Sequence, residues 1–213
     1  MDKNFFKKTR ILDGGMGQEL LNRGIKPHGT IWGATALLYK KYHKIVIDTH
    51  LDFIKAGAEI IVTNSFGSRR RRLIDNNLEK YFKKLNRISG ELAVKAVKKS
   101  KKTVLIAGSL PPQNFTYFAD LGNDLKFIKD GFFQQAKCLN PLDVMCSLKE
   151  CEIGIQSIKS LKKNFLIGIH IRENGKLPSG EKFITVVKKL EKYNPIGIIV
   201  ACVSIEHLEQ IKK

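Results

Sequence analysis

The sequence contains no long hydrophobic run, and this absence excludes a membrane-spanning protein. No apolar stretch in the 213 residues reaches the roughly 18 residues that a membrane-spanning helix requires. The N-terminal segment, MDKNFFKKTRILDGG, carries charge but has no apolar stretch followed by a cleavage site of small residues. A secretory signal is therefore not expected, and the sequence predicts a cytoplasmic protein with no membrane partner.

Glycine-rich nucleotide-binding patterns are also absent. The glycines of the segment DGGMG at 13–17 do not follow G-x-G-x-x-G spacing, and no G-x-x-x-x-G-K-[ST] segment occurs. These two patterns place backbone N–H groups around the phosphates of bound nucleotides. A nucleotide-binding site of either kind is therefore not predicted.

Acidic residues are scarce: 20 Asp and Glu stand against 38 Lys and Arg, which gives a formal net charge of +18. An excess of this size can attract nucleic acid or an anionic surface. Most of the basic residues, however, are lysines scattered along helical stretches such as 95–101, and no nucleic-acid-binding motif accompanies them. Nucleic-acid binding is therefore kept only as a third hypothesis, which salt-sensitive binding to DNA or RNA would support.

Cysteine is scarce as well, with Cys138, Cys146, Cys151 and Cys202 in the whole chain. Their spacing matches neither a C-x-x-C zinc pattern nor a small disulfide framework. In the cytoplasm they should be reduced, and an isolated cysteine usually behaves as a small buried apolar residue. Cys202 ends an apolar strand, where its thiolate could bind zinc. A buried, inert thiol is the other interpretation of that position.

Short apolar segments alternate with longer amphipathic segments along the whole chain. Strands are expected at 10–13, 59–66, 103–110, 142–145, 164–171 and 195–203. Helices are expected at 17–23, 43–56, 78–100, 124–138, 147–161 and 181–193, with a last helix after Ser204. This order, with strands that are apolar on both faces, is typical of a parallel α/β sheet, either open or closed. Because no linker or repeat divides the chain, one domain over 1–213 is predicted.

Two of the expected helices have apolar stripes that predict which side faces the core. In the helix at 43–56, the stripe consists of Ile45, Ile47, Leu51 and Ile54. In the helix at 147–161, it consists of Leu148, Cys151, Ile155 and Ile158. Recurrence at three- and four-residue intervals places these side chains on one side of a helix.

In parallel α/β folds, functional residues follow the carboxyl ends of the strands. The first such place holds Asp13 with Gly14 and Gly15. The carboxylate could accept hydrogen bonds from an ammonium or amide group, and the glycines would allow a ligand close to the backbone. Alternatively, Asp13 caps the helix that follows. At the second strand end, Asn64 either contacts a ligand or is satisfied within the core.

Two further places are expected to be structural. His170 has no neighbouring ligand at metal-binding spacing, so a core or rim histidine is predicted. The four arginines from Arg69 to Arg72 are expected to form a solvated helix start, with a carboxylate or phosphate site as the alternative.

Six segments, taken in order, resemble the homocysteine S-methyltransferase family. They are ILDGGMGQELLNRG, HLDFIKAGAEIIVTNSF, AGSLPP, SLKECEIGIQSIK, GKLPSGE and IIVACVSIEHL, and they span nearly the whole chain between residues 11 and 208. The first two, with their spacing, are the specific ones. The resemblance implies a (β/α)8 TIM-type barrel, of which this chain would contain about six of the eight βα units.

The resemblance also implies a function. The family transfers a methyl group from a small donor to the sulfur of homocysteine, giving methionine, and uses a zinc ion held by three cysteines to keep that sulfur deprotonated. Asp13, Gly14, Gly15 and Asn64 are then expected to bind the substrate. Cys202, in VACVS, matches the first zinc cysteine.

Two departures from the family pattern qualify this prediction. The Gly-Gly-Cys-Cys motif that supplies the other zinc cysteines is absent, and so is the glutamate of a Glu-Thr pair that follows the fourth strand. Glu150 and Glu152 fall instead on the expected helix. Impaired methyltransferase activity in a truncated member is therefore predicted. The alternative is a non-catalytic remnant or subunit that associates with itself or another chain through open sheet edges.

Overall fold

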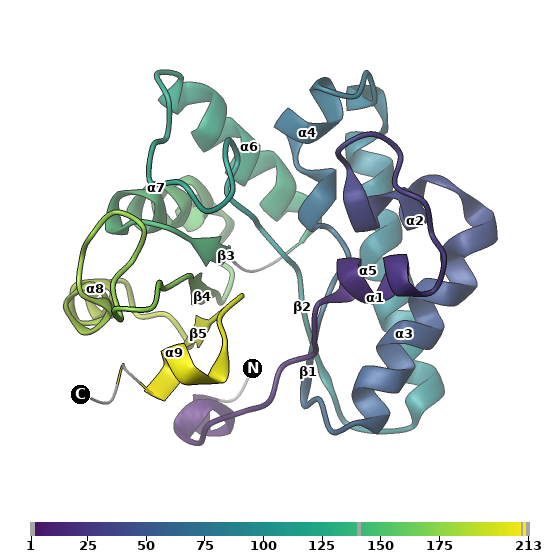
Figure 1. The fold of residues 1–213 in the computed structure, drawn as a ribbon, viewed down its shortest axis with the longest axis horizontal. Coiled ribbons are helices and arrows are strands. Elements are labelled where there is room, and N and C mark those ends of the chain that lie inside the picture. Colours follow the sequence, from purple (N-terminus) through teal and green to yellow (C-terminus); the bar gives the residue numbers. More distant parts are fainter. Residues whose placement is uncertain (1–2, 140–141, 210, 212–213) are drawn as a thin grey trace. The chain divides into compact units, whose positions relative to one another are not determined.

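The computed structural model describes residues 3–139, 142–209 and 211 (Figure 1). The chain forms two compact units. The first unit is Lys7–Ser109, and the second is Leu110–Lys213 together with Met1–Phe6.

The first unit contains a small parallel sheet. Strand β1 (Ile60–Val62) pairs with β2 (Leu105–Ala107) in parallel, and Leu12 forms a parallel bridge with Ile60. The first three expected strands are therefore neighbours in sequence order. β1 is shorter than the predicted strand at 59–66 because the chain turns directly after it, where the Ser65 N–H donates to the Thr63 carbonyl at 2.7 Å.

The helices of the first unit are α1 (Met16–Asn22), α2 (Thr35–Leu38), α3 (His43–Lys55), α4 (Arg70–Ile74) and α5 (Phe82–Ser100). Helices α3 and α5 lie side by side (Figure 1). Leu85, Ile88 and Leu92 recur along α5 at helical spacing and are buried in the same core as Leu20 and Val46. The core of this unit therefore lies mainly between helices.

The second unit contains a three-stranded parallel sheet in the order β3 (Leu142–Met145), β4 (Leu166–Ile169) and β5 (Gly197–Val200). Its helices are α6 (Leu125–Cys138), α7 (Leu148–Ile158), α8 (Phe183–Leu190) and α9 (Ile205–Glu209). Strand β4 is buried at every residue, whereas β5 is half-buried throughout. The side chains of Phe132 and Ile167 lie fully inside the core of this unit.

The start of α7 is fixed by two hydrogen bonds that both involve Glu150. The Ser147 hydroxyl accepts from the Glu150 N–H at 3.1 Å, and Glu150 Oε2 accepts from the Cys146 N–H at 2.9 Å. This arrangement resembles a capping box, which satisfies N–H groups that a helix start leaves without partners. Glu150 is only 2% exposed, so its carboxylate lies buried between the end of β3 and α7.

Removal of this cap is expected to destabilise the second unit. We expect Ser147→Ala to lower the free energy of unfolding by about 1 kcal/mol, because a helical N–H loses its acceptor. Ser157→Ala is the matched control, since the Ser157 hydroxyl donates to the Ile153 carbonyl within α7 and caps no helix start. Urea unfolding followed by circular dichroism measures both, and equal midpoints for Ser147→Ala and the wild type would contradict the prediction.

The parallel pairing of successive strands within each sheet is confirmed, as are the seven expected helices, to within a few residues at their ends. The described residues form two separate sheets in place of the single expected sheet, and the expected strand at 10–13 is represented by the bridge at Leu12. Single turns of 3-10 helix supply parts of three predicted helices, at Glu79–Tyr81, Lys159–Leu161 and Glu191–Tyr193. The sequence did not predict α2. The strand pairings of the described residues do not close a barrel. Among those residues, no helix has the length and apolar character needed to cross a membrane.

Candidate functional site

Asp13 lies directly after the first paired segment of the first unit. Its N–H donates to the Ile60 carbonyl at 3.0 Å, and its carboxylate oxygen Oδ2 accepts from the Val62 N–H at 2.8 Å. The side chain is 3% exposed. The N-cap residue of α1 is Gly15, so Asp13 does not occupy that position. Instead, two hydrogen bonds to β1 fix Asp13 at the carboxyl edge of the sheet.

The glycines that follow Asp13 serve different purposes. A Cβ at Gly14 would lie 2.8 Å from a ring carbon of Phe53, and a Cβ at Gly17 would lie 2.9 Å from the Trp32 ring. These two positions therefore require glycine for packing within the protein. At Gly15 the nearest atom would be 3.9 Å away, and the residue is exposed. Gly15 is therefore the one of these three that leaves space for a ligand beside the backbone.

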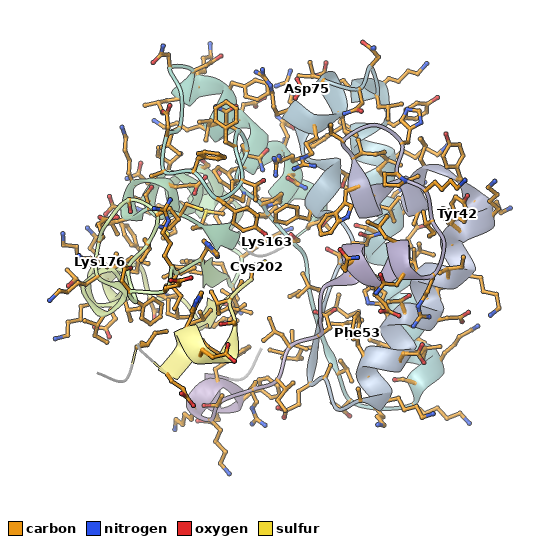
Figure 2. All side chains as sticks on the ribbon, viewed as in Figure 1. Tyr42, Phe53, Asp75, Lys163, Lys176 and Cys202 are labelled. Atoms are coloured by element: carbon orange, nitrogen blue, oxygen red, sulfur yellow. The ribbon has the colours of Figure 1, made fainter. Side chains whose placement is uncertain are left out.

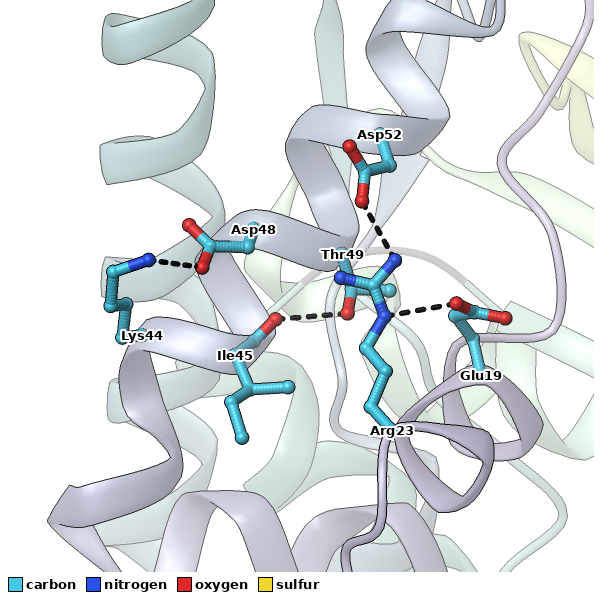
Figure 3. Close-up of polar contacts among 7 residues, drawn as sticks. All are labelled: Glu19, Arg23, Lys44, Ile45, Asp48, Thr49 and Asp52. Atoms are coloured by element: carbon cyan, nitrogen blue, oxygen red, sulfur yellow. Dashed lines mark hydrogen bonds and ion pairs between the residues drawn. The ribbon is translucent and has the colours of Figure 1, made fainter.

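Helix α1, which begins just after this turn, is tied to α3 by Arg23 (Figure 3). The Arg23 guanidinium donates to Glu19 Oε1 at 2.9 Å and to Asp52 Oδ2 at 2.7 Å. The Asp52 carboxylate, followed by the other contacts, raises the pKa of Arg23. Because α3 also carries Phe53, which packs at Gly14, this helix supports the turn at Gly14.

His50 lies on the same side of α3 and is completely buried. Its Nδ1 atom lies 3.9 Å from Asp13 Oδ2. Burial lowers the pKa of His50 to about 4, so the ring is neutral at physiological pH. The sequence-based apolar stripe on this helix missed His50: the buried positions are Val46, Thr49, His50 and Ile54, and of the four predicted residues only Ile54 is fully buried.

The buried His50 predicts a dependence of stability on pH. Its pKa in the folded protein is below the ordinary value of 6.5, so the unfolded chain binds the proton first as the pH falls. Stability is therefore complete above about pH 6.5 and decreases towards pH 4, by about 3 kcal/mol in total. Urea unfolding at pH 7 and pH 5 measures this loss, and His50→Leu should make it clearly smaller. An unchanged loss of unfolding free energy between pH 7 and pH 5 in that variant would contradict the prediction.

Asn64 is buried and makes a structural contact. Its Nδ2 donates to the Gly33 carbonyl at 2.9 Å, which holds the preceding loop against the end of β1. Nearby, Thr63 Oγ1 accepts from the Ser109 N–H at 3.0 Å, and Ser65 Oγ donates to the Ser109 carbonyl at 3.1 Å. These side chains join the carboxyl ends of β1 and β2. Asp13 and Asn64 thus follow neighbouring parallel segments at one edge of this sheet, while contact of Asn64 with a ligand stays a prediction.

The arginine segment differs from the expected solvated helix start at its first residue. Arg69 is only 3% exposed, with its guanidinium carbon 5.6 Å from the centre of the Phe66 ring. Arg70 pairs with Glu79 at 2.8 Å and Arg71 with Asp75 at 3.1 Å, and Arg72 donates to the Thr30 carbonyl. The segment therefore binds neighbouring parts of the first unit.

Cys202 lies in the second unit, in the link between β5 and α9 (Figure 2). The interpretation as a buried thiol is wrong, because Cys202 is exposed. Its backbone is left-handed, with φ of 58°, which is uncommon for a residue other than glycine. On the neighbouring strand end, His170 is half-buried, as predicted for a rim residue. Its Nδ1 lies 3.4 Å from the Ala201 carbonyl, and its ring centre lies 4.9 Å from that of Tyr117.

The described residues do not provide a complete zinc site. They contain no group of three or more His, Cys, Asp or Glu side chains that could hold a metal ion. Burial, followed by the charge of Glu150, raises the pKa of the Cys146 thiol to about 12, and burial also raises that of Cys151. In the absence of a metal ion, these two buried thiols are therefore protonated at physiological pH. Glu150 is engaged at the start of α7, consistent with the predicted absence of a free glutamate after β3.

Comparisons with known proteins agree on one family. The homocysteine S-methyltransferase family model matches residues 10–213. Homocysteine S-methyltransferase 2 of Saccharomyces cerevisiae is 26% identical over 219 residues, which cover 89% of this chain and 66% of that protein. The Escherichia coli homocysteine S-methyltransferase is 32% identical over 117 residues, or 52% of this chain and 37% of that enzyme.

A solved structure shows the same fold. The metallated form of the Escherichia coli homocysteine methyltransferase MmuM superposes with a TM-score of 0.79 at 21% identity, covering 94% of this chain and 77% of that chain. The chain thus covers 66% of the yeast relative and 77% of the MmuM chain. The family model matches the chain from the first paired segment through Cys202 to residue 213. The chain therefore belongs to the homocysteine S-methyltransferase family.

Proposed function

We propose that this chain binds homocysteine and supports transfer of a methyl group from a small donor to its sulfur, giving methionine. One observation carries the proposal beyond family membership. The Asp13 carboxylate is fixed by β1 and is followed by a turn in which Gly15 leaves open space. A fixed carboxylate at a strand end is suited to bind the ammonium group of an amino acid.

The reaction itself sets two requirements. A bond forms between the homocysteine sulfur and the methyl carbon while the bond from that carbon to the donor breaks, and the thiol proton passes to solvent. A donor that carries the methyl on positively charged sulfur or nitrogen leaves as a neutral molecule. The acceptor must be a thiolate, yet a free thiol with a pKa near 8.5 is only about 3% ionised at pH 7.

We further propose that Cys202 supplies one thiolate to the zinc ion that the family uses. It is the exposed cysteine after β5, and zinc would keep the substrate sulfur deprotonated. The described residues offer no complete ligand set for that ion.

The domain architecture, the cellular compartment and the partners of the chain are proposed as follows. We propose that residues 1–213 form one TIM-type domain with about six βα units, in the cytoplasm and without a nucleic-acid partner. The parallel pairing of successive strands supports the architecture. A non-catalytic subunit is the second candidate function, because β5 is the outermost strand of its sheet in the described part of the chain and is half-buried throughout.

Homocysteine binding tests the proposed function. We expect isothermal titration calorimetry to show that Asp13→Asn binds homocysteine about 10- to 100-fold more weakly than the wild type, because a charge-assisted hydrogen bond is lost. Asp48→Asn is the matched control, since Asp48 lies on α3 and pairs with Lys44. Equal affinity of Asp13→Asn and the wild type would overturn the assignment of Asp13. Methionine formation from a panel of sulfonium and quaternary ammonium donors would then identify the donor class.

A further inference from the structure

His50 is a buried polar side chain without a hydrogen bond. It is 0% exposed, and within the described residues neither ring nitrogen has a hydrogen-bond partner. Buried polar groups are nearly always hydrogen-bonded, because burial removes their contacts with water. An apolar side chain would fill the same volume of α3 without that penalty. The presence of an imidazole here therefore requires a physical explanation.

A carboxylate close to the ring explains its position. His50 Nδ1 lies 3.9 Å from Asp13 Oδ2, the oxygen that accepts from the Val62 N–H at 2.8 Å. Phe53, almost one turn further along α3, packs at Gly14. The same face of α3 therefore supports two successive residues of the turn, Asp13 through His50 and Gly14 through Phe53. An approach of roughly 1 Å would bring His50 Nδ1 to hydrogen-bond distance from Oδ2.

We propose that His50 is a positioning residue whose neutral ring donates its Nδ1 proton to the Asp13 carboxylate and fixes that carboxylate for the ammonium group of an amino-acid substrate. This inference rests on the proposed function. Hydrogen bonds at ligand-free sites are often long and shorten in the complex.

The neutral state of His50 is essential to this role. A charged imidazolium would compete with the substrate ammonium for the same carboxylate, whereas a neutral ring adds a donor without adding charge. Complete burial keeps the ring neutral, since a buried charge is costly. A neutral histidine has a single N–H, so the role requires the tautomer with the proton on Nδ1.

The tautomer provides the first test. We expect ¹⁵N NMR of the full chain at pH 7 to show His50 with its proton on Nδ1, and Asp13→Ala to shift it towards the Nε2–H form that imidazole prefers in water. A merely structural histidine would not respond in this way. A proton on Nε2 in both proteins would overturn the proposal. Because no homocysteine is present, this arm decides the His50–Asp13 contact independently of the proposed function.

Affinity provides the second test, by calorimetry with homocysteine. We expect His50→Leu to bind about three- to tenfold more weakly than the wild type, because the orienting donor is lost, and His50→Gln to recover most of the affinity through its side-chain N–H. Wild-type affinity in His50→Leu would overturn the proposal. If the wild type does not bind homocysteine, the proposed function fails, and the NMR result still decides the contact.

Discussion

After dialysis at pH 7, the 213-residue chain is expected to retain far less than one zinc ion per molecule and to form methionine at least about thirty-fold more slowly than the Escherichia coli homocysteine methyltransferase. The factor follows from the thiolate fraction alone, because only about 3% of a thiol with a pKa near 8.5 is ionised at pH 7. Cys202 is exposed, but Cys146 and Cys151 are buried with raised pKa values.

Elemental analysis of the dialysed protein and a methionine assay measure the two quantities. Cys202→Ser and Cys138→Ser form a matched pair, because both cysteines are exposed and only Cys202 is assigned to zinc. Any residual zinc should fall in Cys202→Ser and stay unchanged in Cys138→Ser. One zinc per molecule and turnover at the rate of the Escherichia coli enzyme would show that another residue completes the ligand set.

Gly67→Ala is expected to destabilise the first unit by at least about 3 kcal/mol, or to prevent its folding, because a Cβ there would lie 2.1 Å from the Ile31 carbonyl oxygen. That clash is with backbone, so no side chain can move aside. Gly33→Ala should have a similar but smaller effect, since its Cβ would lie 2.7 Å from the Gly17 Cα. The loop before α2 and the turn after β1 are therefore in close backbone contact.

Gly15→Ala is the control, because its Cβ would meet nothing closer than 3.9 Å and its φ of −68° suits alanine. Thermal unfolding followed by circular dichroism should give a lower melting temperature for Gly67→Ala than for Gly33→Ala. The melting temperature of Gly15→Ala should stay near that of the wild type. Equal melting temperatures of Gly67→Ala and Gly15→Ala would contradict the close contact between Gly67 and the Ile31 carbonyl. Calorimetry on Gly15→Ala then tests substrate binding, since a methyl group there would narrow the space assigned to the ligand.

Strand order and helix positions could be predicted because they depend on local patterns. The apolar segment NFLIGIHI predicted the strand realised as β4, and the stripe with Cys151, Ile155 and Ile158 predicted the buried side of α7. Strand ends were predicted less well. β1 ends at Val62, several residues before Phe66, because a turn held by Thr63 and Ser65 forms within a segment that looks uniformly strand-like.

The polar partners of the site could not be predicted from spacing. His50 was missed because a histidine interrupts an apolar stripe, although the fold places its Nδ1 atom 3.9 Å from Asp13 Oδ2. The role of Gly14 depends on Phe53, 39 residues further along the chain, and that of Glu150 depends on a backbone N–H. Each of these contacts joins elements that only the fold brings together.

The short connection between β3 and α7 limits how this protein can evolve or be engineered. Only residues 146 and 147 separate the two elements, and Glu150 locks both ends of that link. In contrast, residues 108–124 separate β2 from α6, and residues 170–182 separate β4 from α8. Loops of that length tolerate insertion and sequence change, whereas a locked two-residue link does not. Altered ligand preference should therefore arise by variation in those two long loops, while the length and sequence of the β3–α7 link stay unchanged.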